Sequence, residues 1–116
     1  IMELKKIAAE AECRYIPFAP HNPSGPVANA ATLQLGATCP NFEILEIMYS
    51  DVEWRKDITN EKLEYKDGYI KIPDKAGLGI EIDEAKCLKH TYKPHTLRHY
   101  TGALTDIRPA KNEFYF

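Results

Sequence analysis

Long apolar runs are absent from this sequence of 116 residues. No stretch approaches the roughly 20 apolar residues that a membrane-spanning helix needs. The first 15 residues are amphipathic and charged, which is unlike a secretory signal peptide. These absences predict a cytoplasmic protein that has no membrane partner.

An excess of charge of one sign is absent as well. The chain has 15 Lys and Arg against 17 Asp and Glu, a formal net charge of -2. The basic residues are scattered along the sequence, whereas a nucleic-acid-binding domain gathers them on one face. We therefore expect no nucleic-acid partner.

A disulfide framework is also absent. Cys13, Cys39 and Cys87 are odd in number and far apart in the sequence, as in proteins whose thiols stay reduced. We expect all three to be buried packing residues. What remains, 44% hydrophobic and 28% charged residues, is the composition of one ordinary globular domain.

The first 50 residues alternate between helical and extended patterns. Leu4, Ile7, Ala8 and Ala11 have helical spacing with no capping residue ahead of them, so we expect this helix to begin upstream of Ile1. The apolar residues 14–18 predict a buried strand that ends near His21, because Pro17 and Pro20 exclude a helix. A helix over 25–37 follows, with Ser24 as its cap and Pro26 in its first turn, and 41–49 predicts a second strand.

This helix–strand–helix–strand order is typical of parallel βα units, and the predicted class is α/β. We expect segments 14–18 and 41–46 to be adjacent parallel strands joined by a right-handed crossover. Beyond Asp51 the pattern changes to a polar stretch. Two short extended pieces then surround a turn at 73–79, and a short helix opens at Asp83.

His21 and Glu46 are the residues to which this order assigns chemistry. His21 lies at the carboxyl end of the first predicted parallel strand and Glu46 at the corresponding end of the next one, where reactive groups of α/β proteins collect. Neighbouring strands are about 5 Å apart, so a histidine and a carboxylate so placed suit proton transfer near neutral pH. The alternative is that His21 caps a backbone group in a proline-rich turn and Glu46 is solvated.

Four stretches together resemble a known family: "APHNPSGPVANAATLQL", "NFEILE", "DGYIKIPDKAGLGIEIDE" and "LRHYTGALTDIRP". They are similar to the C-terminal part of mandelate racemase/muconate lactonizing enzyme-like members of the enolase superfamily, closest to acid-sugar dehydratases of the galactonate dehydratase type. The resemblance covers nearly the whole chain in the family's order.

The resemblance implies the last two βα units of a (β/α)8-type barrel over residues 1–63, with a C-terminal extension toward the capping domain over 64–116. It implies His21 as the acid/base residue and Glu46 as a hydrogen-bond partner of the substrate carboxylate. It also implies Mg²⁺, which holds a sugar-acid substrate while a base removes the proton α to its carboxylate. The implied reaction is dehydration, catalysed by a lyase. The alternatives are a racemase, epimerase or cycloisomerase of the same superfamily, or a module that only binds or assembles.

The chain is shorter than the family's pattern requires. A complete barrel takes about 250 residues, so the strands that carry the three metal carboxylates would lie upstream of Ile1. The aspartate expected to orient the histidine would lie there too, which leaves the second ring nitrogen of His21 without a visible partner. We therefore expect the fragment alone to be inactive.

An excised strand pair exposes open edges and an apolar helix face. We therefore expect either a homo-oligomer or association with the missing N-terminal part. The alternative is that 92–116 folds back over the exposed face. A zinc site at Cys87, His90, His95 and His99 is disfavoured, because the spacing matches no compact zinc motif.

Overall fold

A computed structural model describes residues 1–48 and 53–92 of the chain. Its elements are α1 (Met2–Glu12), α2 (Pro26–Gly36), the 3₁₀ turn η1 (Glu53–Asp57), β1 (Tyr65–Lys66), β2 (Tyr69–Ile70), α3 (Glu84–Cys87) and the 3₁₀ turn η2 (Leu88–His90). None of the described helices has the length and apolar character needed to cross a membrane.

Helix α1 confirms the predicted N-terminal helix, and as expected no side chain caps its first turn. Of the predicted apolar face only Ala8 is fully buried, whereas Leu4 and Ile7 are exposed. The described residues therefore cover only part of the apolar surface that this helix offers.

Helix α2 confirms the predicted second helix, with Pro26 in its first turn. The cap is Gly25 rather than Ser24, and no side chain bonds the free N–H groups there. Ala30, Leu33 and Leu35 are buried as the pattern predicts. Two polar residues of the same helix, Asn29 and Thr32, are buried as well.

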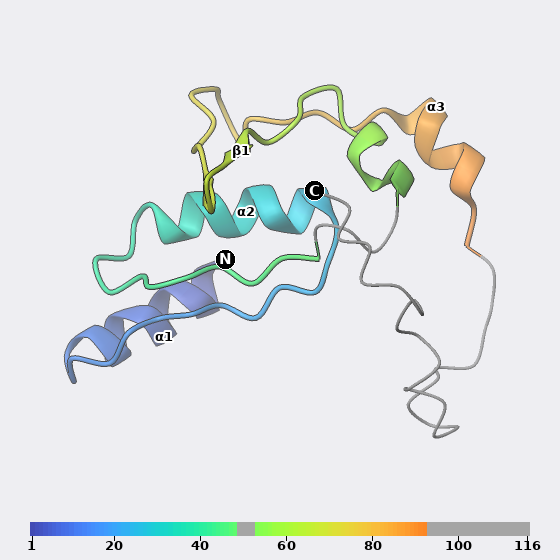
Figure 1. The fold of residues 1–116 in the computed structure, drawn as a ribbon. Coiled ribbons are helices and arrows are strands. Elements are labelled where there is room, and N and C mark those ends of the chain that lie inside the picture. The colour runs from blue at the N-terminus through green and yellow to red at the C-terminus, as the bar shows by residue number, and fades with distance from the viewer. Residues whose placement is uncertain (49–52, 93–116) are drawn as a thin grey trace, which may run out of the picture.

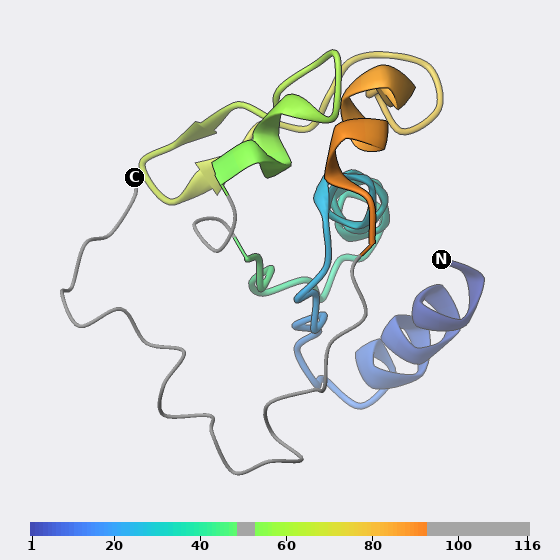
Figure 2. The same ribbon diagram turned by 90° about the vertical axis from the view of Figure 1, so that its right-hand side faces the viewer.

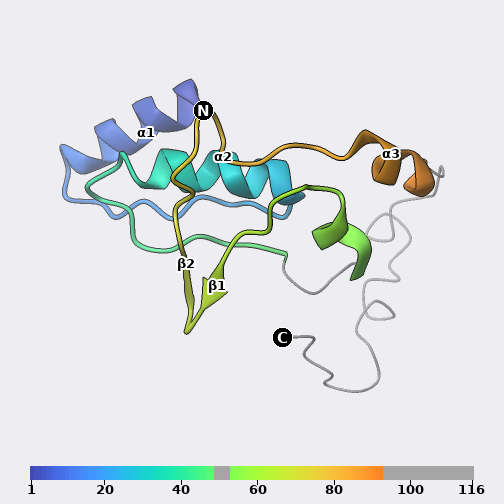
Figure 3. The ribbon, with the colours of Figure 1, turned by 90° about the horizontal axis from the view of Figure 1, so that it is seen from above.

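Two extended segments run in parallel on one side of the helices. Phe18 pairs with Phe42 in parallel, because Phe18 donates its N–H to the Asn41 carbonyl at 2.7 Å and accepts from Glu43 N at 2.9 Å. Both helices lie on the same side of these segments, which Figures 2 and 3 show from two directions. The predicted adjacency and parallel direction are confirmed.

The prediction of a buried strand over 14–18 is wrong except at Phe18. Tyr15 is 98% exposed and has a left-handed φ of 57°, which breaks an extended run. Pro17 has no N–H with which to extend the ladder. The described part of 41–49 likewise pairs only at Phe42, and Tyr49 lies outside the described residues.

The small core lies where the helices meet the paired segments. It consists of Ala8, Phe18, Leu35 and Cys39, with Phe42 packed against it. Gly36 permits this packing, because a Cβ there would lie 3.0 Å from the Phe42 ring. Of the three cysteines expected to be buried, Cys39 is buried, Cys87 is half-buried and Cys13 is exposed, and all three are free thiols.

A second unit, 58–83, lies above α2 in Figure 1. Its outer part is a hairpin in which β1 and β2 pair antiparallel, and sequence reasoning did not predict it. The two-residue turn is Asp67-Gly68, with φ of 51° and 83°, the left-handed pair that favours short hairpins. Its inner part is an antiparallel pairing of Thr59 with Ile82.

The helix that was predicted to open at Asp83 is confirmed as α3. The Asp83 side chain accepts from Lys86 N at 3.0 Å, which is the usual N-cap bond. The η2 turn continues α3, and its His90 ring stacks on Trp54 of η1 with centroids 4.0 Å apart. The proposed fold-back of 92–116 lies outside the described residues, except at Tyr92 itself, which is exposed.

Candidate active site

His21 and Glu46 meet directly. The Nδ1 atom of His21 and the Oε2 atom of Glu46 form an ion-pair contact, although the two residues are 25 positions apart in the sequence. A carboxylate only accepts hydrogen bonds, so Nδ1 is the donor, and the Nε2 atom of a neutral His21 is left as the basic nitrogen. The side chain of His21 is 78% exposed and that of Glu46 is 49% exposed, so a molecule in solution can approach Nε2.

Asn22 holds the same carboxylate from the backbone. Its N–H donates to Glu46 Oε2 at 3.1 Å, so a single oxygen accepts from two consecutive residues, 21 and 22. Asn22 is only 4% exposed. Its side-chain Nδ2 donates at 2.7 Å to Oδ1 of Asn29 on α2, which is 9% exposed. Asn22 therefore connects the exposed His21–Glu46 pair, through its backbone N–H, to a buried hydrogen bond between two side-chain amides.

Arg55 of η1 connects the two segments that carry the pair. Its Nη1 atom donates to the Ser24 carbonyl at 2.6 Å and lies 3.5 Å from the Met48 carbonyl. Ser24 follows His21 by three residues, and Met48 follows Glu46 by two. The guanidinium thus spans the loops that end the two parallel segments.

The prediction that His21 and Glu46 point toward one side is confirmed by their contact. The second nitrogen of His21, for which the sequence offered no partner, is bonded by Glu46 itself. Sequence reasoning missed Asn22, Asn29 and Arg55. An asparagine inside a helix is unfavourable by propensity, and Asn29 within an otherwise apolar helical pattern was a signal that could have been followed.

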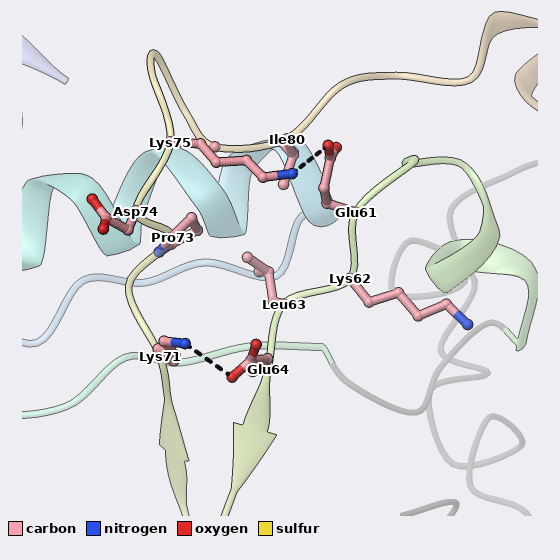
Figure 4. A pocket seen from close by; sticks show the side chains of 10 residues that line it. Glu61, Lys62, Leu63, Glu64, Lys71, Pro73, Asp74, Lys75 and Ile80 are labelled. Carbon is pink, nitrogen blue, oxygen red and sulfur yellow. Dashed lines mark hydrogen bonds and ion pairs between the residues drawn. The ribbon is translucent and has the colours of Figure 1, made fainter.

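Apart from the His21–Glu46 pair, a hollow lies between the residues that precede β1 and those that follow β2, with a volume near 340 Å³ (Figure 4). Lys75 Nζ donates to Glu61 at 2.7 Å, and the Glu81 N–H donates to the same carboxylate at 3.0 Å. These two bonds lower the pKa of Glu61 below its ordinary value, and the bond from Lys75 has the larger effect. Lys71 and Glu64 also pair, at 3.5 Å. The charges that line this hollow are thus largely matched with one another.

Within residues 1–48 and 53–92, no group of three or more His, Cys, Asp or Glu side chains is arranged to hold a metal ion. His21 and Glu46 alone do not make a Mg²⁺ site, because that ion takes oxygen ligands in octahedral geometry. Of the zinc candidates, His95 and His99 lie outside the described residues.

Two curated relatives match most of the chain. A D-galactonate dehydratase family member from Streptomyces bingchenggensis is 39% identical over 112 residues, which covers 91% of this chain and 27% of that protein. The D-xylonate dehydratase of Haloferax volcanii is 36% identical over 95 residues, which covers 82% of this chain and 23% of that protein. The chain therefore spans less than a third of the relatives that it matches.

A solved structure also resembles this chain in fold and in sequence. A candidate L-alanine-DL-glutamate epimerase from Burkholderia xenovorans, crystallised with magnesium and fumarate, aligns with a TM-score of 0.69 and 33% identity. The match covers 73% of this chain and 21% of that one. The enolase C-terminal domain-like family matches residues 1–86. This chain therefore belongs to the enolase superfamily, and its residues 1–86 belong to the enolase C-terminal domain-like family.

Proposed function

We propose that the chain is the C-terminal part of a dehydratase that removes water from a sugar acid. The observation that carries this proposal is the His21–Glu46 pair at the ends of two parallel segments, in a chain whose curated relatives are named sugar-acid dehydratases. In the proposed assignment, 1–63 are the last two βα units of a (β/α)8 barrel, and 64–116 extend toward the capping domain.

His21 is the acid/base residue of the proposal. Its Nε2 atom exchanges a proton with the substrate, either the proton α to the carboxylate or the one that accompanies departure of the β-hydroxyl. Glu46 accepts from Nδ1, so the imidazolium that forms during turnover gains a counter-charge. In this account Glu46 acts first on His21, and its contact with the substrate carboxylate is a second role.

The proposal includes Mg²⁺ in the whole protein, where it would stabilise the enolate charge. The described residues offer no set of metal ligands. We therefore propose that the ligands belong to the part of the whole protein that corresponds to the stretch of the relatives outside the match with this chain.

We also propose that the rest of the protein covers the apolar surface left open here. Ile7, Tyr15 and Ile16 are exposed, and they line two hollows beside α1, of about 800 and 450 Å³. A second copy of the chain is the alternative occupant. Sedimentation of the isolated 116-residue chain tests this proposal, because a stable, cooperatively unfolding monomer at micromolar concentration would refute the need for a partner.

The test of the activity uses the complete protein that contains this chain, with Mg²⁺ and a panel of aldonic acids that includes D-galactonate and D-xylonate. We expect formation of a 3-deoxy-2-keto acid, detected by NMR. The epimerase among the structural neighbours supports a second candidate. Inversion at the α carbon of an acid, without loss of water from any member of the panel, would favour that reaction over dehydration.

A further inference from the structure

Asn29 is an unusual residue for its place in the fold. It lies in the first turns of α2 and is 9% exposed, beside the buried Ala30. Asparagine is a poor helix former, and a buried amide is costly unless it is hydrogen-bonded. An alanine or leucine would suit both the helix and the burial better. The residue therefore needs an explanation other than packing.

The bond that Asn29 makes leads to the acid/base pair. Its Oδ1 accepts from Asn22 Nδ2 at 2.7 Å, and both side chains are more than nine-tenths buried. The backbone N–H of Asn22 donates at 3.1 Å to the same Glu46 oxygen that contacts His21 Nδ1. Two hydrogen bonds thus connect a rigid helix to the carboxylate that orients His21.

The exposure of the pair makes this support necessary. His21 and Glu46 are 78% and 49% exposed, and an exposed ion pair fixes geometry weakly, because water competes for both partners. The segment between His21 and α2 has no regular structure. A buried bond that fixes the Asn22 backbone would hold the N–H group against Glu46 without help from the exposed side chains.

We propose that Asn29 is a positioning residue for the acid/base pair, and that it acts through Asn22 on Glu46 and thereby on the tautomer and orientation of His21. This inference rests on the proposed function of His21. It assigns to α2 a role in the site besides that of connecting two parallel segments.

The test compares three variants of the complete protein. Asn29→Ala removes the acceptor of the Asn22 bond. Asn29→Asp keeps an acceptor oxygen at the same place and is the conservative rescue. Thr32→Val is the matched control, because Thr32 is equally buried on the same helix and, among the residues that the structure describes, its hydroxyl bonds only the Ala28 carbonyl within α2.

We expect Asn29→Ala to lower kcat by about tenfold or more with little change in KM, since small misplacements of a catalytic group are costly. The nitrogen NMR signals of His21 should move from one tautomer, with the proton on Nδ1, toward a mixture of two. Asn29→Asp should recover most of the kcat and the single tautomer. Thr32→Val should leave both at the wild-type values.

A purely structural role would give a different result. If Asn29→Ala and Thr32→Val lower the melting temperature alike while kcat and the His21 signals stay unchanged, the inference is overturned. The NMR readout also separates this inference from the proposed function. A wild-type protein that dehydrates no aldonic acid refutes the function, whereas an Asn29-dependent change of the His21 tautomer in that protein still supports positioning.

Discussion

Glu46→Gln should separate activity from stability. Glu46 Oε2 accepts from His21 Nδ1 and from Asn22 N, and glutamine keeps the size of the side chain while it removes the charge. Because the His21 and Glu46 side chains are 78% and 49% exposed, water competes for both, and we expect the loss of their contact to lower the free energy of unfolding by less than about 1 kcal/mol.

The effect on turnover should be larger. Without the carboxylate, His21 loses the counter-charge of its protonated form. The glutamine amide has one accepting oxygen and one donating NH2 group, so it can face either ring tautomer and fixes the proton on Nδ1 less well than a group that only accepts. A misoriented acid/base group costs about 10²-fold, which corresponds to about 2.7 kcal/mol in the activation barrier. The expected change in the barrier thus exceeds the expected change in stability.

The assay measures kcat for the dehydration and the melting temperature on the same samples of the complete protein. Glu43→Gln is the control, because Glu43 is an exposed glutamate of the same segment, and it should match the wild type in both measurements. Unchanged kcat in Glu46→Gln would refute the reasoning. A loss of melting temperature that fully explains the loss of activity would refute it equally.

Three further outcomes test other contacts. Arg55→Ala should speed amide hydrogen exchange in peptides that cover 20–26 and 44–48, because the guanidinium spans these loops, and unchanged exchange would contradict that bridge. His90→Ala should shift the emission of Trp54, the one tryptophan of the chain, to longer wavelength, whereas His90→Phe should preserve the stack; identical spectra would refute the contact. The Lys75 hydrogen bond lowers the pKa of Glu61 below its ordinary value near 4.5, so its stabilising effect is present above that pH and lost as the pH falls through the lowered pKa. Glu61→Gln should therefore show a shallower fall in melting temperature between about pH 5 and pH 3 than the wild type, and parallel curves would contradict this assignment.

The helices were the part of the fold that local pattern could predict. Apolar spacing, Pro26 in a first turn and Asp83 at a cap are local signals, and α1, α2 and α3 follow them. The Asp67-Gly68 hairpin was equally local in its signal, but it was read only as part of a polar stretch and was missed. Helical bonds close within one segment, which is why sequence alone suffices for them.

The parallel segments could be predicted in direction but not in extent. Their pairing is confirmed at Phe18 and Phe42, yet a parallel strand is fixed by neighbours on both sides, and such neighbours are not local in sequence. Tyr15 is an example: its left-handed backbone conformation interrupts the extended segment that the apolar pattern predicted.

The candidate site was half predictable. His21 and Glu46 follow from strand order, because residues at the ends of adjacent parallel strands meet. Asn29 and Arg55 do not follow from it. Asn29 acts through a side-chain bond to Asn22 in the loop before its own helix, and Arg55 acts through a bond to the Ser24 carbonyl, 31 residues away. A buried amide inside a helix is nevertheless a signal that sequence reasoning can use.

The most direct test of the central claim follows a sugar acid by NMR in deuterated water with the complete protein and its His21→Asn variant. We expect the wild type to form the 3-deoxy-2-keto acid and His21→Asn to form it about 10²- to 10⁴-fold more slowly, with an unchanged melting temperature. Dehydration at the wild-type rate in His21→Asn would contradict the account.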